Sequence, residues 1–312
     1  MTLLDMLTKR ADSKENASLN FATPISVVSF PDQIYGLSVR NRKVLVSSFI
    51  RHSNENHVMF EGRKFLHRLP ASKVMWSPVS DTSFGSISTS LRIWKFSEEK
   101  PVLKLQSSGK SGTGPSPLTS FDWHAASPTR VATCAIDTTV TIWDIERGKM
   151  DTQMIAHDKA VFDVAYAGAS NPALFATVSE DGSMRLFDMR DLDHSTIVYE
   201  GSAPLLRLVW GQQNANTIAA IASEANELLL FDMRKTGFKN KSIKLPSCPN
   251  AIAWSDSAIL STALADGSVV AVDTDAASLK TVGIFPTPAV NLARDGNSLA
   301  VAHGSSVSII SN

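Results

Sequence analysis

Residues 175–188 have the sequence FATVSEDGSMRLFD, and two other stretches superimpose on them without a gap. These stretches are VATCAIDTTVTIWD (131–144) and LSTALADGSVVAVD (260–273). In each stretch two apolar, β-prone segments flank a central aspartate, a pattern typical of two strands joined by a tight turn. The corresponding positions are Thr133, Thr177 and Thr262 in the first strand, Asp137, Asp181 and Asp266 in the turn, and Trp143, Phe187 and Val272 near the end. The chain therefore contains an internal repeat.

Looser copies of the same pattern extend the repeat over the rest of the chain, at 83–96, 218–232 and 298–311. Short apolar or alternating runs precede the copies, at 25–30, 73–76, 120–123, 161–166, 207–210, 251–254 and 289–293. Their spacing of about 40–48 residues is the length at which one four-stranded propeller blade fits. Helical periodicity is almost absent, so the chain is expected to be all-β.

This period, with strands that end in Trp-Asp or Phe-Asp, resembles the WD repeats. The resemblance implies a seven-bladed β-propeller in which an N-terminal strand near residues 17–22 forms the outer strand of the last blade and so closes the ring. We expect residues 1–16 to form a flexible tail and residues 17–312 to form this single domain.

The resemblance also implies a buried network of Asp, His, Ser or Thr, and Trp side chains within a blade. His157, Thr177 and Asp181 supply three members in one blade, where Phe187 has no N–H to donate. No other copy is complete either: Thr133, Asp137 and Trp143 occur without a matching histidine, and Thr262 and Asp266 occupy the same positions in a third copy. We expect these residues to be structural.

The composition is that of a globular chain without a dominant charge. The 30 basic and 30 acidic side chains cancel, and 43% of the residues are apolar, so no overall field attracts nucleic acid or a membrane. No apolar run approaches the roughly 20 residues that span a bilayer. The N-terminal residues match neither a secretory nor a mitochondrial signal. Two cysteines, Cys134 and Cys248, far apart in sequence, favour a reducing compartment.

Three segments show a closer resemblance: IAHDKAVFDVAY (155–166), RDLDHSTIVYE (190–200) and PLLRLVWGQQNANTIAA (204–220). They are similar to the Transparent Testa Glabra and Anthocyanin-eleven proteins, and to their animal counterpart, a WD-repeat adaptor of DYRK-type kinases of the DDB1- and cullin-4-associated factor type. The resemblance implies a scaffold without catalytic activity or cofactor, found in cytoplasm and nucleus. It would bring a protein kinase, a basic helix-loop-helix factor or another transcription regulator to its partners, as a monomeric propeller within a larger complex.

The resemblance further implies a binding surface made by the loops before the inner strands and by the aspartate turns. The expected inner-strand entries are Ser26, Ser72, Thr119, Phe162, Leu206, Asn250 and Val290, and the residues before the turn aspartates are Ile136, Glu180 and Ala265. Of these, Phe162, Leu206 and Ile136 would form an apolar patch able to anchor an amphipathic peptide. Alternatively, they plug the central channel. Glu180 and Asn250 are further candidate partner-binding residues.

The sequence Phe-Asp-Met-Arg occurs twice, at 187–190 and 231–234. In WD-repeat substrate receptors of cullin-4 ubiquitin ligases, an arginine two residues after the strand-end aspartate contacts the ligase's adaptor, and Arg190 and Arg234 match that position. The planar guanidinium suits such a contact, because it binds carboxylates or carbonyls through two hydrogen bonds. A substrate receptor is therefore the alternative function. Arginine is also common on solvent after a strand, so the motif is only moderately specific.

Other functions have weaker support in the sequence. The seven histidines form no spaced pair that suggests a metal site, and SGKSGTGPSP (108–117) lacks the context of a phosphate-binding loop, so we interpret it as a polar loop and a possible phosphorylation target. Residues 40–73 are basic and residues 251–312 acidic, which indicates either solvated edges or a surface for an acidic partner or a nucleic-acid backbone. A propeller enzyme would need polar groups converging on the channel, whereas the inner-strand entries are mostly apolar or small.

Overall fold

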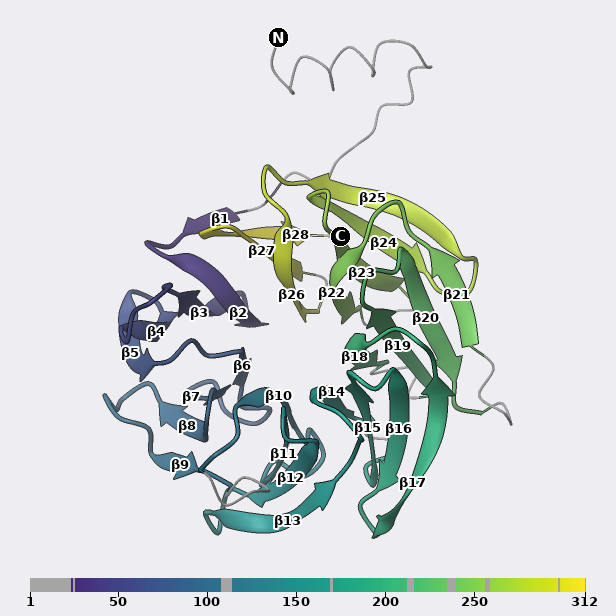
Figure 1. Cartoon of the computed structure of the whole chain (residues 1–312). Coiled ribbons are helices and arrows are strands. Elements are labelled where there is room, and N and C mark those ends of the chain that lie inside the picture. The colour runs from purple at the N-terminus through teal and green to yellow at the C-terminus, as the bar shows by residue number, and fades with distance from the viewer. Residues whose placement is uncertain are drawn as a thin grey trace.

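The computed structural model describes residues 24, 26–107, 114–168, 171–211, 216–234, 240–255, 259–296 and 298–311. Over these ranges the chain forms 28 strands, β1 to β28, in seven four-stranded antiparallel sheets. The sheets are arranged around a central axis like the blades of a propeller (Figure 1). The prediction of an all-β, seven-bladed propeller is thus confirmed. The described residues contain no helix long and apolar enough to cross a membrane.

Blades 1 to 4 each use four consecutive strands, of which the first lines the axis and the fourth lies on the circumference. Blade 1 contains β2 (Gln33–Arg40), β3 (Lys43–Phe49), β4 (Asn56–Phe60) and β5 (Arg63–Arg68). Blade 2 contains β6 (Lys73–Trp76), β7 (Ser83–Ile87), β8 (Leu91–Lys95) and β9 (Leu103–Leu105). Blade 3 contains β10 (Leu118–Trp123), β11 (Arg130–Ala135), β12 (Thr139–Asp144) and β13 (Lys149–Ile155). Blade 4 contains β14 (Val161–Tyr166), β15 (Leu174–Ser179), β16 (Ser183–Asp188) and β17 (Asp191–Glu200).

Blades 5 and 6 repeat this order, and blade 7 combines the two ends of the chain. Blade 5 contains β18 (Leu205–Trp210), β19 (Thr217–Ala222), β20 (Glu227–Asp232) and β21 (Asn240–Lys244). Blade 6 contains β22 (Pro249–Trp254), β23 (Ile259–Leu264), β24 (Ser268–Asp273) and β25 (Ser278–Ile284). Blade 7 contains β26 (Ala289–Asp295), β27 (Ser298–His303) and β28 (Ser306–Ser311), and its outermost strand is β1 (Ser26–Ser29).

The ring is closed by β1, which pairs antiparallel with β28 from Ser26 opposite Ile309 to Ser29 opposite Ser306. The expected mechanism of closure is present, but the strand lies later than residues 17–22, which fall outside the described residues. The expectation that Ser26 begins an inner strand is wrong, because the alternating pattern of residues 25–30 suits an outer strand equally well. The inner strand of blade 1 is β2, where Tyr35 occupies the position assigned to Ser26.

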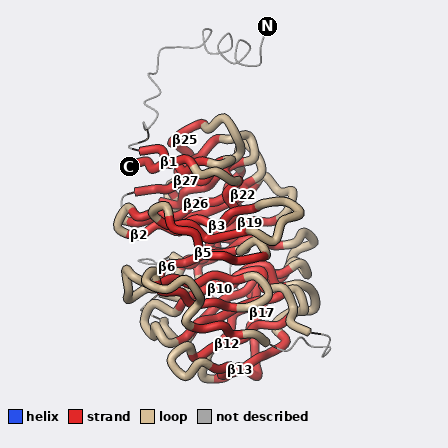
Figure 2. Tube along the Cα trace, turned by 90° about the vertical axis from the view of Figure 1, so that its left-hand side faces the viewer, coloured by secondary structure: helices blue, strands red, loops and turns tan. Residues whose placement is uncertain are grey.

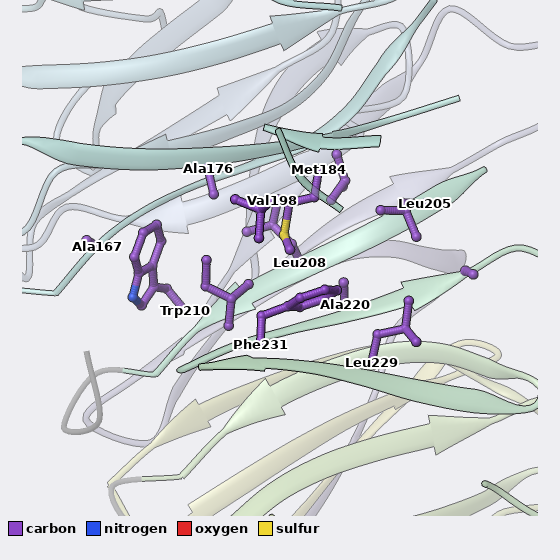
Figure 3. Close-up of a cluster of buried hydrophobic side chains, with 13 residues drawn as sticks. Ala167, Ala176, Met184, Val198, Leu205, Leu208, Trp210, Ala220, Leu229 and Phe231 are labelled. Atoms are coloured by element: carbon purple, nitrogen blue, oxygen red, sulfur yellow. The ribbon is translucent and has the colours of Figure 1, made fainter. Parts of the chain in front are cut away.

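The hydrophobic core consists of seven clusters, each packed between two neighbouring blades. Figure 3 shows the cluster in which Ala176 and Met184 of blade 4 meet Leu208 and Phe231 of blade 5. No single blade covers its own apolar faces. Each blade is therefore stable only against its neighbours, as in other repeat architectures.

The loops lie on the two flat sides of the disc (Figure 2). We call the side on which the inner strands begin the entry end. It carries the connections between blades and the turn between the second and third strands of each blade. The opposite side, the exit end, carries the turns that follow the first and third strands.

Candidate functional site

One residue near the start of each inner strand belongs to a ring around the channel at the entry end, which we call the mouth ring. It is the second residue of the strand in blades 3 to 7 and the third in blade 1. The pairing register shifts at this residue in blades 3 to 7, and across two residues in blade 1. Such a β-bulge leaves one residue unpaired and redirects its side chain. The members are Tyr35, Thr119, Phe162, Leu206, Asn250 and Val290, with Ser72 at the corresponding position just before β6.

The polar members of the mouth ring bind the backbone of the next blade. Ser72 Oγ donates to the carbonyl of Leu118 (3.1 Å) and Thr119 Oγ1 donates to that of Val161 (2.5 Å). Asn250, predicted to bind a partner, is exposed, yet its Nδ2 donates to the carbonyl of Ala289 at 3.3 Å. These three side chains therefore hold neighbouring blades together.

The apolar members of the mouth ring form no side-chain hydrogen bond to the described part of the next blade. Tyr35 is 42% exposed and packs against Phe49, with 5.6 Å between ring centroids. Phe162 and Leu206 are half-buried, and Leu206 also packs against the cluster between blades 5 and 6. The structure thus places the predicted residues Phe162 and Leu206 at one end of the propeller. It adds Tyr35, which an alignment of QIYGLSVR (33–40) with VFDVAY (161–166) would have revealed.

Two further predicted residues, Ile136 and Glu180, lie in turns at the same entry end. Ile136 is 49% exposed, and its backbone N–H donates to the carbonyl of Pro117. Glu180 is exposed and its N–H donates to the carbonyl of Ala160. In both cases the backbone is fixed while the side chain stays open to a partner.

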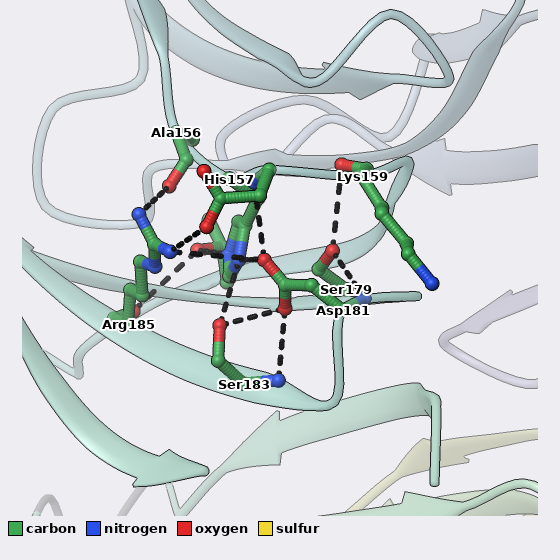
Figure 4. Close-up of polar contacts among 9 residues, drawn as sticks. Ala156, His157, Lys159, Ser179, Asp181, Ser183 and Arg185 are labelled. Atoms are coloured by element: carbon green, nitrogen blue, oxygen red, sulfur yellow. Dashed lines mark hydrogen bonds and ion pairs between the residues drawn. The ribbon is translucent and has the colours of Figure 1, made fainter. Parts of the chain in front are cut away.

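The predicted network in blade 4 is a set of hydrogen bonds around a buried histidine (Figure 4). His157 Nδ1 lies 3.0 Å from Asp181 Oδ2, and its Nε2 lies 2.7 Å from Thr177 Oγ1. Asp181 Oδ1 accepts hydrogen bonds from the Ser183 amide (2.8 Å) and hydroxyl (2.7 Å). Burial lowers the pKa of His157 to about 4, against the opposing effect of Asp181. The imidazole is therefore neutral at pH 7 and has a structural role.

The other predicted structural residues occupy the same turns in blades 3 and 6. Trp143 Nε1 donates to Thr133 Oγ1 at 2.8 Å, and Asp137 Oδ1 accepts from the Thr139 hydroxyl at 2.7 Å. Asp266 Oδ1 accepts from the amide (2.8 Å) and hydroxyl (2.6 Å) of Ser268. The Thr262 hydroxyl is buried without a partner among the described residues. Each turn aspartate therefore caps its own turn, and the three carboxylates form no cluster.

Blade 2 contains a network that sequence reasoning missed. His67 Nε2 lies 2.9 Å from Ser86 Oγ, which also accepts a hydrogen bond from Trp94 Nε1 at 2.9 Å. Ser86 and Trp94 are eight residues apart, whereas Thr133 and Trp143 are ten apart. The turn between the two strands is thus shorter and lacks the aspartate, so a gapless alignment hides the match.

Arg190 and Arg234 lie at the exit end, in the turns that follow β16 and β20 on neighbouring blades. Arg190 binds Asp188 through Nε (2.9 Å to Oδ1) and Nη2 (2.5 Å to Oδ2). Arg234 binds Asp232 in the same way, at 3.0 Å and 2.9 Å. The two arginine side chains are 78% and 63% exposed. Each guanidinium is therefore oriented by its own turn while it remains accessible to another protein.

The central channel contains more charge than the inner-strand entries suggested. Its cavity of about 340 Å³ is lined by residues that include Lys73, Asp163 and Arg207. Asp163 accepts hydrogen bonds from Ser120 Oγ (2.5 Å) and the Leu208 amide (3.1 Å), and it lies 3.5 Å from Lys73 Nζ. The buried carboxylate thus connects blades 2, 3, 4 and 5. Among the described residues no group of three or more potential ligands could hold a metal ion.

Several cations of the basic segment 40–73 already have partners within the protein. Arg40 forms an ion pair with Asp81 (2.6 Å), and Arg63 donates to the carbonyl of Phe96. Lys73 is the channel residue beside Asp163. Only the remaining cations of the segment are candidates for an acidic partner.

No family model matches the chain. Individual proteins, however, are similar to it in sequence. The chain is 37% identical over 248 residues to a DDB1- and CUL4-associated factor 7 homolog of Dictyostelium discoideum, covering 72% of this chain and 76% of that protein. An uncharacterised WD repeat-containing protein of Schizosaccharomyces pombe is 35% identical over 217 residues, or 59% of this chain and 49% of that protein. A WD repeat-containing protein of Saccharomyces cerevisiae is 34% identical over 207 residues, or 53% of this chain and 39% of that protein. The chain thus matches half or less of each yeast protein.

Proposed function

Because the chain belongs to the WD-repeat family, we propose that it is a non-enzymatic adaptor that binds a protein kinase or a transcription regulator at the entry end of the propeller. In this role it holds the bound protein beside its partners in the cytoplasm and nucleus. The similarity to a DDB1- and CUL4-associated factor 7 homolog supports an adaptor role. One observation carries the proposal. The apolar side chains at the entry end, such as those of Tyr35, Phe162 and Ile136, form no hydrogen bond to a described residue of a neighbouring blade and so remain available to a partner.

The division of the mouth ring supports a binding role for its apolar members. Ser72, Thr119 and Asn250 hold the blades together, whereas the side chains of Tyr35 and Phe162 form no hydrogen bond to a described residue of a neighbouring blade. Aromatic side chains provide large contact areas at protein interfaces and lose little conformational entropy on binding. A peptide that covers Tyr35, Phe162 and Ile136 would remove apolar surface from water at several blades at once.

Affinity purification with mass spectrometry tests this proposal. We expect the wild type to recover a DYRK-type kinase or a basic helix-loop-helix factor, and the double variant Tyr35→Ser, Ile136→Ser to lose it. Both residues are more than 40% exposed, so the variant should still fold, which thermal melting will show. Ile197→Ser is a matched control, because Ile197 is 51% exposed on the circumferential strand β17. If the double variant recovers as much kinase or transcription factor as the Ile197→Ser control, the entry end is not the binding site.

A second function, as substrate receptor of a cullin-4 ubiquitin ligase, is favoured by the geometry of Arg190 and Arg234. Each guanidinium is oriented by its aspartate, which reduces the entropy lost when a partner binds it. The relative named as a DDB1- and CUL4-associated factor supports the same function. The double variant Arg190→Ala, Arg234→Ala should fail to recover the cullin-4 adaptor, whereas Arg147→Ala, which removes an exposed arginine from the corresponding turn of blade 3, should retain it. Undiminished recovery by the double variant would exclude this contact.

A further inference from the structure

Arg92 and Arg185 occupy the same site in blades 2 and 4. Arg92 lies on β8, opposite Ser86 of β7, and Arg185 lies on β16, opposite Thr177 of β15. Ser86 and Thr177 are the hydroxyl residues of the two blade networks. The two arginines are therefore equivalent by strand, by register and by the network beside them.

The residue after each network histidine has opposite charge in the two blades. His157 is followed by Asp158, whose Oδ2 lies 2.8 Å from Arg185 Nη2. His67 is followed by Arg68. The site that holds an ion pair in blade 4 thus contains two guanidinium groups in blade 2.

The other acid of blade 4 also has no counterpart in blade 2. Asp181 lies 3.8 Å from Arg185 and belongs to the turn between the second and third strands. The corresponding turn of blade 2 is two residues shorter, and residues 88–90 are Ser-Thr-Ser. The only hydrogen bond of the Arg92 guanidinium to a described residue runs from Nε to Ser90 Oγ, at 3.3 Å.

A third cation adjoins this pair. Lys104 on β9 is the cross-strand partner of Arg92, and both Lys104 and Arg68 are exposed. Among the described residues, none of the three cations forms an ion pair. The pKa of Arg92 is lowered by burial and by the charge of Arg68, so the two guanidinium groups repel each other. The nearby loop 50–55 adds Arg51, His52 and one acid, Glu55.

The backbone holds Arg68 in this unfavourable arrangement. Its φ of +38° lies in the left-handed region, which is uncommon for residues other than glycine. Asn56 Nδ2 donates to the carbonyl of Arg68 at 3.0 Å and fixes the conformation. A conformation of this kind persists only where the surrounding structure enforces it, and such positions concentrate at binding sites.

We propose that Arg68, Arg92 and Lys104 form a site that binds the phosphate group of a phosphorylated peptide. A phosphate monoester has close to two negative charges at pH 7 and three acceptor oxygens, which match two guanidinium groups and an ammonium group. The ligand is a short phosphorylated segment rather than a nucleic acid, because the chain has a formal net charge of zero and lacks the long-range field that steers a polyanion. The site does not depend on the adaptor function proposed above.

The test compares a degenerate peptide library centred on phosphoserine with its unphosphorylated counterpart, by fluorescence anisotropy. Arg68→Asp introduces the acid that blade 4 has at this site, and aspartate tolerates a left-handed backbone better than most residues. We expect this variant to lose the preference for phosphorylated peptides by at least tenfold and to melt at a higher temperature, because the new carboxylate pairs with Arg92. Arg92→Gln should lose the preference as well, because it removes one of the two guanidinium groups. Arg147→Asp, the same charge change in an exposed residue at the exit end, should retain it.

Each contrary result is decisive. The proposal is wrong if the wild type does not prefer phosphorylated peptides, or if Arg68→Asp and Arg92→Gln bind them as the wild type does. It is also wrong if inorganic phosphate raises the melting temperature above that in chloride of equal ionic strength while no peptide shows a preference, because free phosphate would then be the ligand. Tighter binding of single-stranded RNA, lost in Arg68→Asp, would overturn it as well.

Discussion

At the scale of single residues, the stability of the propeller depends on buried polar side chains that must stay neutral or fully bonded. His67 and His157 each contact a buried hydroxyl group, Ser86 Oγ at 2.9 Å and Thr177 Oγ1 at 2.7 Å. Burial lowers the pKa of both imidazoles to about 4. An ionised imidazole at either place would disrupt its network, and this makes folding sensitive to pH.

We predict that the free energy of unfolding decreases as the pH falls from 6.5 to 4. Well above pH 6.5 neither state binds a proton at His67 or His157, so their contribution is fully present. Below pH 6.5 the unfolded chain binds protons that the folded chain does not accept until about pH 4. Each histidine then removes up to about 1.4 kcal/mol per pH unit. Urea unfolding between pH 7 and pH 4.5 measures this slope, and His67→Gln should reduce it markedly. An unchanged slope in that variant would contradict the assignment.

A second prediction concerns the hydroxyl of blade 2. Ser86→Ala leaves both Trp94 Nε1 and His67 Nε2 without a partner, which should cost about 2–4 kcal/mol of stability. Thr133→Val is the matched control, because it removes the partner of Trp143 Nε1 and a long hydrogen bond (3.5 Å) to the Thr141 carbonyl but leaves no histidine without a partner, and it should cost less. Equilibrium urea unfolding compares the two variants at pH 7. Equal losses of stability in the two variants would show that the hydrogen bond between His67 and Ser86 does not stabilise the protein.

At the scale of strands, the closing strand β1 is both short and exposed, yet it covers the edge of the last blade. Its four residues pair with β28, and without them β28 would present unpaired backbone groups to solvent.

Residues 83–96 illustrate a second effect at this scale. The turn of blade 2 is two residues shorter and lacks the aspartate, yet the hydrogen-bond network of the blade persists.

We predict that deletion of residues 1–29 lowers the free energy of unfolding by about 1–4 kcal/mol, from the loss of four cross-strand pairs. It should also promote association through the uncovered edge of β28. Deletion of residues 1–22 retains β1 and serves as the control. Thermal melting and light scattering measure the two effects. If the shorter deletion is equally damaging, residues before β1 also stabilise the fold.

At the scale of the whole molecule, neighbouring blades are joined by side chains as well as by the core. Asp163 contacts Lys73 of blade 2, Ser120 of blade 3 and the Leu208 amide of blade 5. Its carboxylate is almost completely buried, with 4% of the residue exposed. The residue therefore couples the folding of several blades.

We predict that Asp163→Ala costs about 3–5 kcal/mol, because it removes the carboxylate that pairs with Lys73 and accepts hydrogen bonds from Ser120 Oγ and the Leu208 amide. Lys73 Nζ then keeps its hydrogen bond to Ser120 Oγ, at 3.1 Å, but loses its ion pair. The exposed ion pair between Arg130 and Asp151, at 3.0 Å, provides the comparison, and Asp151→Ala should cost less than about 1 kcal/mol. Chemical unfolding followed by tryptophan fluorescence measures both. A small effect of Asp163→Ala would show that the blades are coupled by the apolar clusters alone.

The sequence by itself determined the repeat, the strand content and the number of blades. These features depend on local patterns, since a strand, an aspartate turn and a second strand recur wherever residues such as Thr133, Asp137 and Trp143 recur. It also indicated the entry-end residues Phe162, Leu206 and Ile136, because one repeat can be superimposed on the next. The placement of Ser26 failed for the same reason, since alternation alone does not distinguish an inner strand from an outer one.

Only the tertiary structure decided which residues meet across blades. The partners of Asp163 come from three other blades, and His67 of blade 1 completes the network of blade 2. The charge reversal at Arg68 becomes visible only when blades 2 and 4 are compared in register, because Arg68 and Arg92 belong to different blades. Contacts of this kind depend on how the ring closes and on where each turn is shortened, and no pattern within a single repeat contains that information.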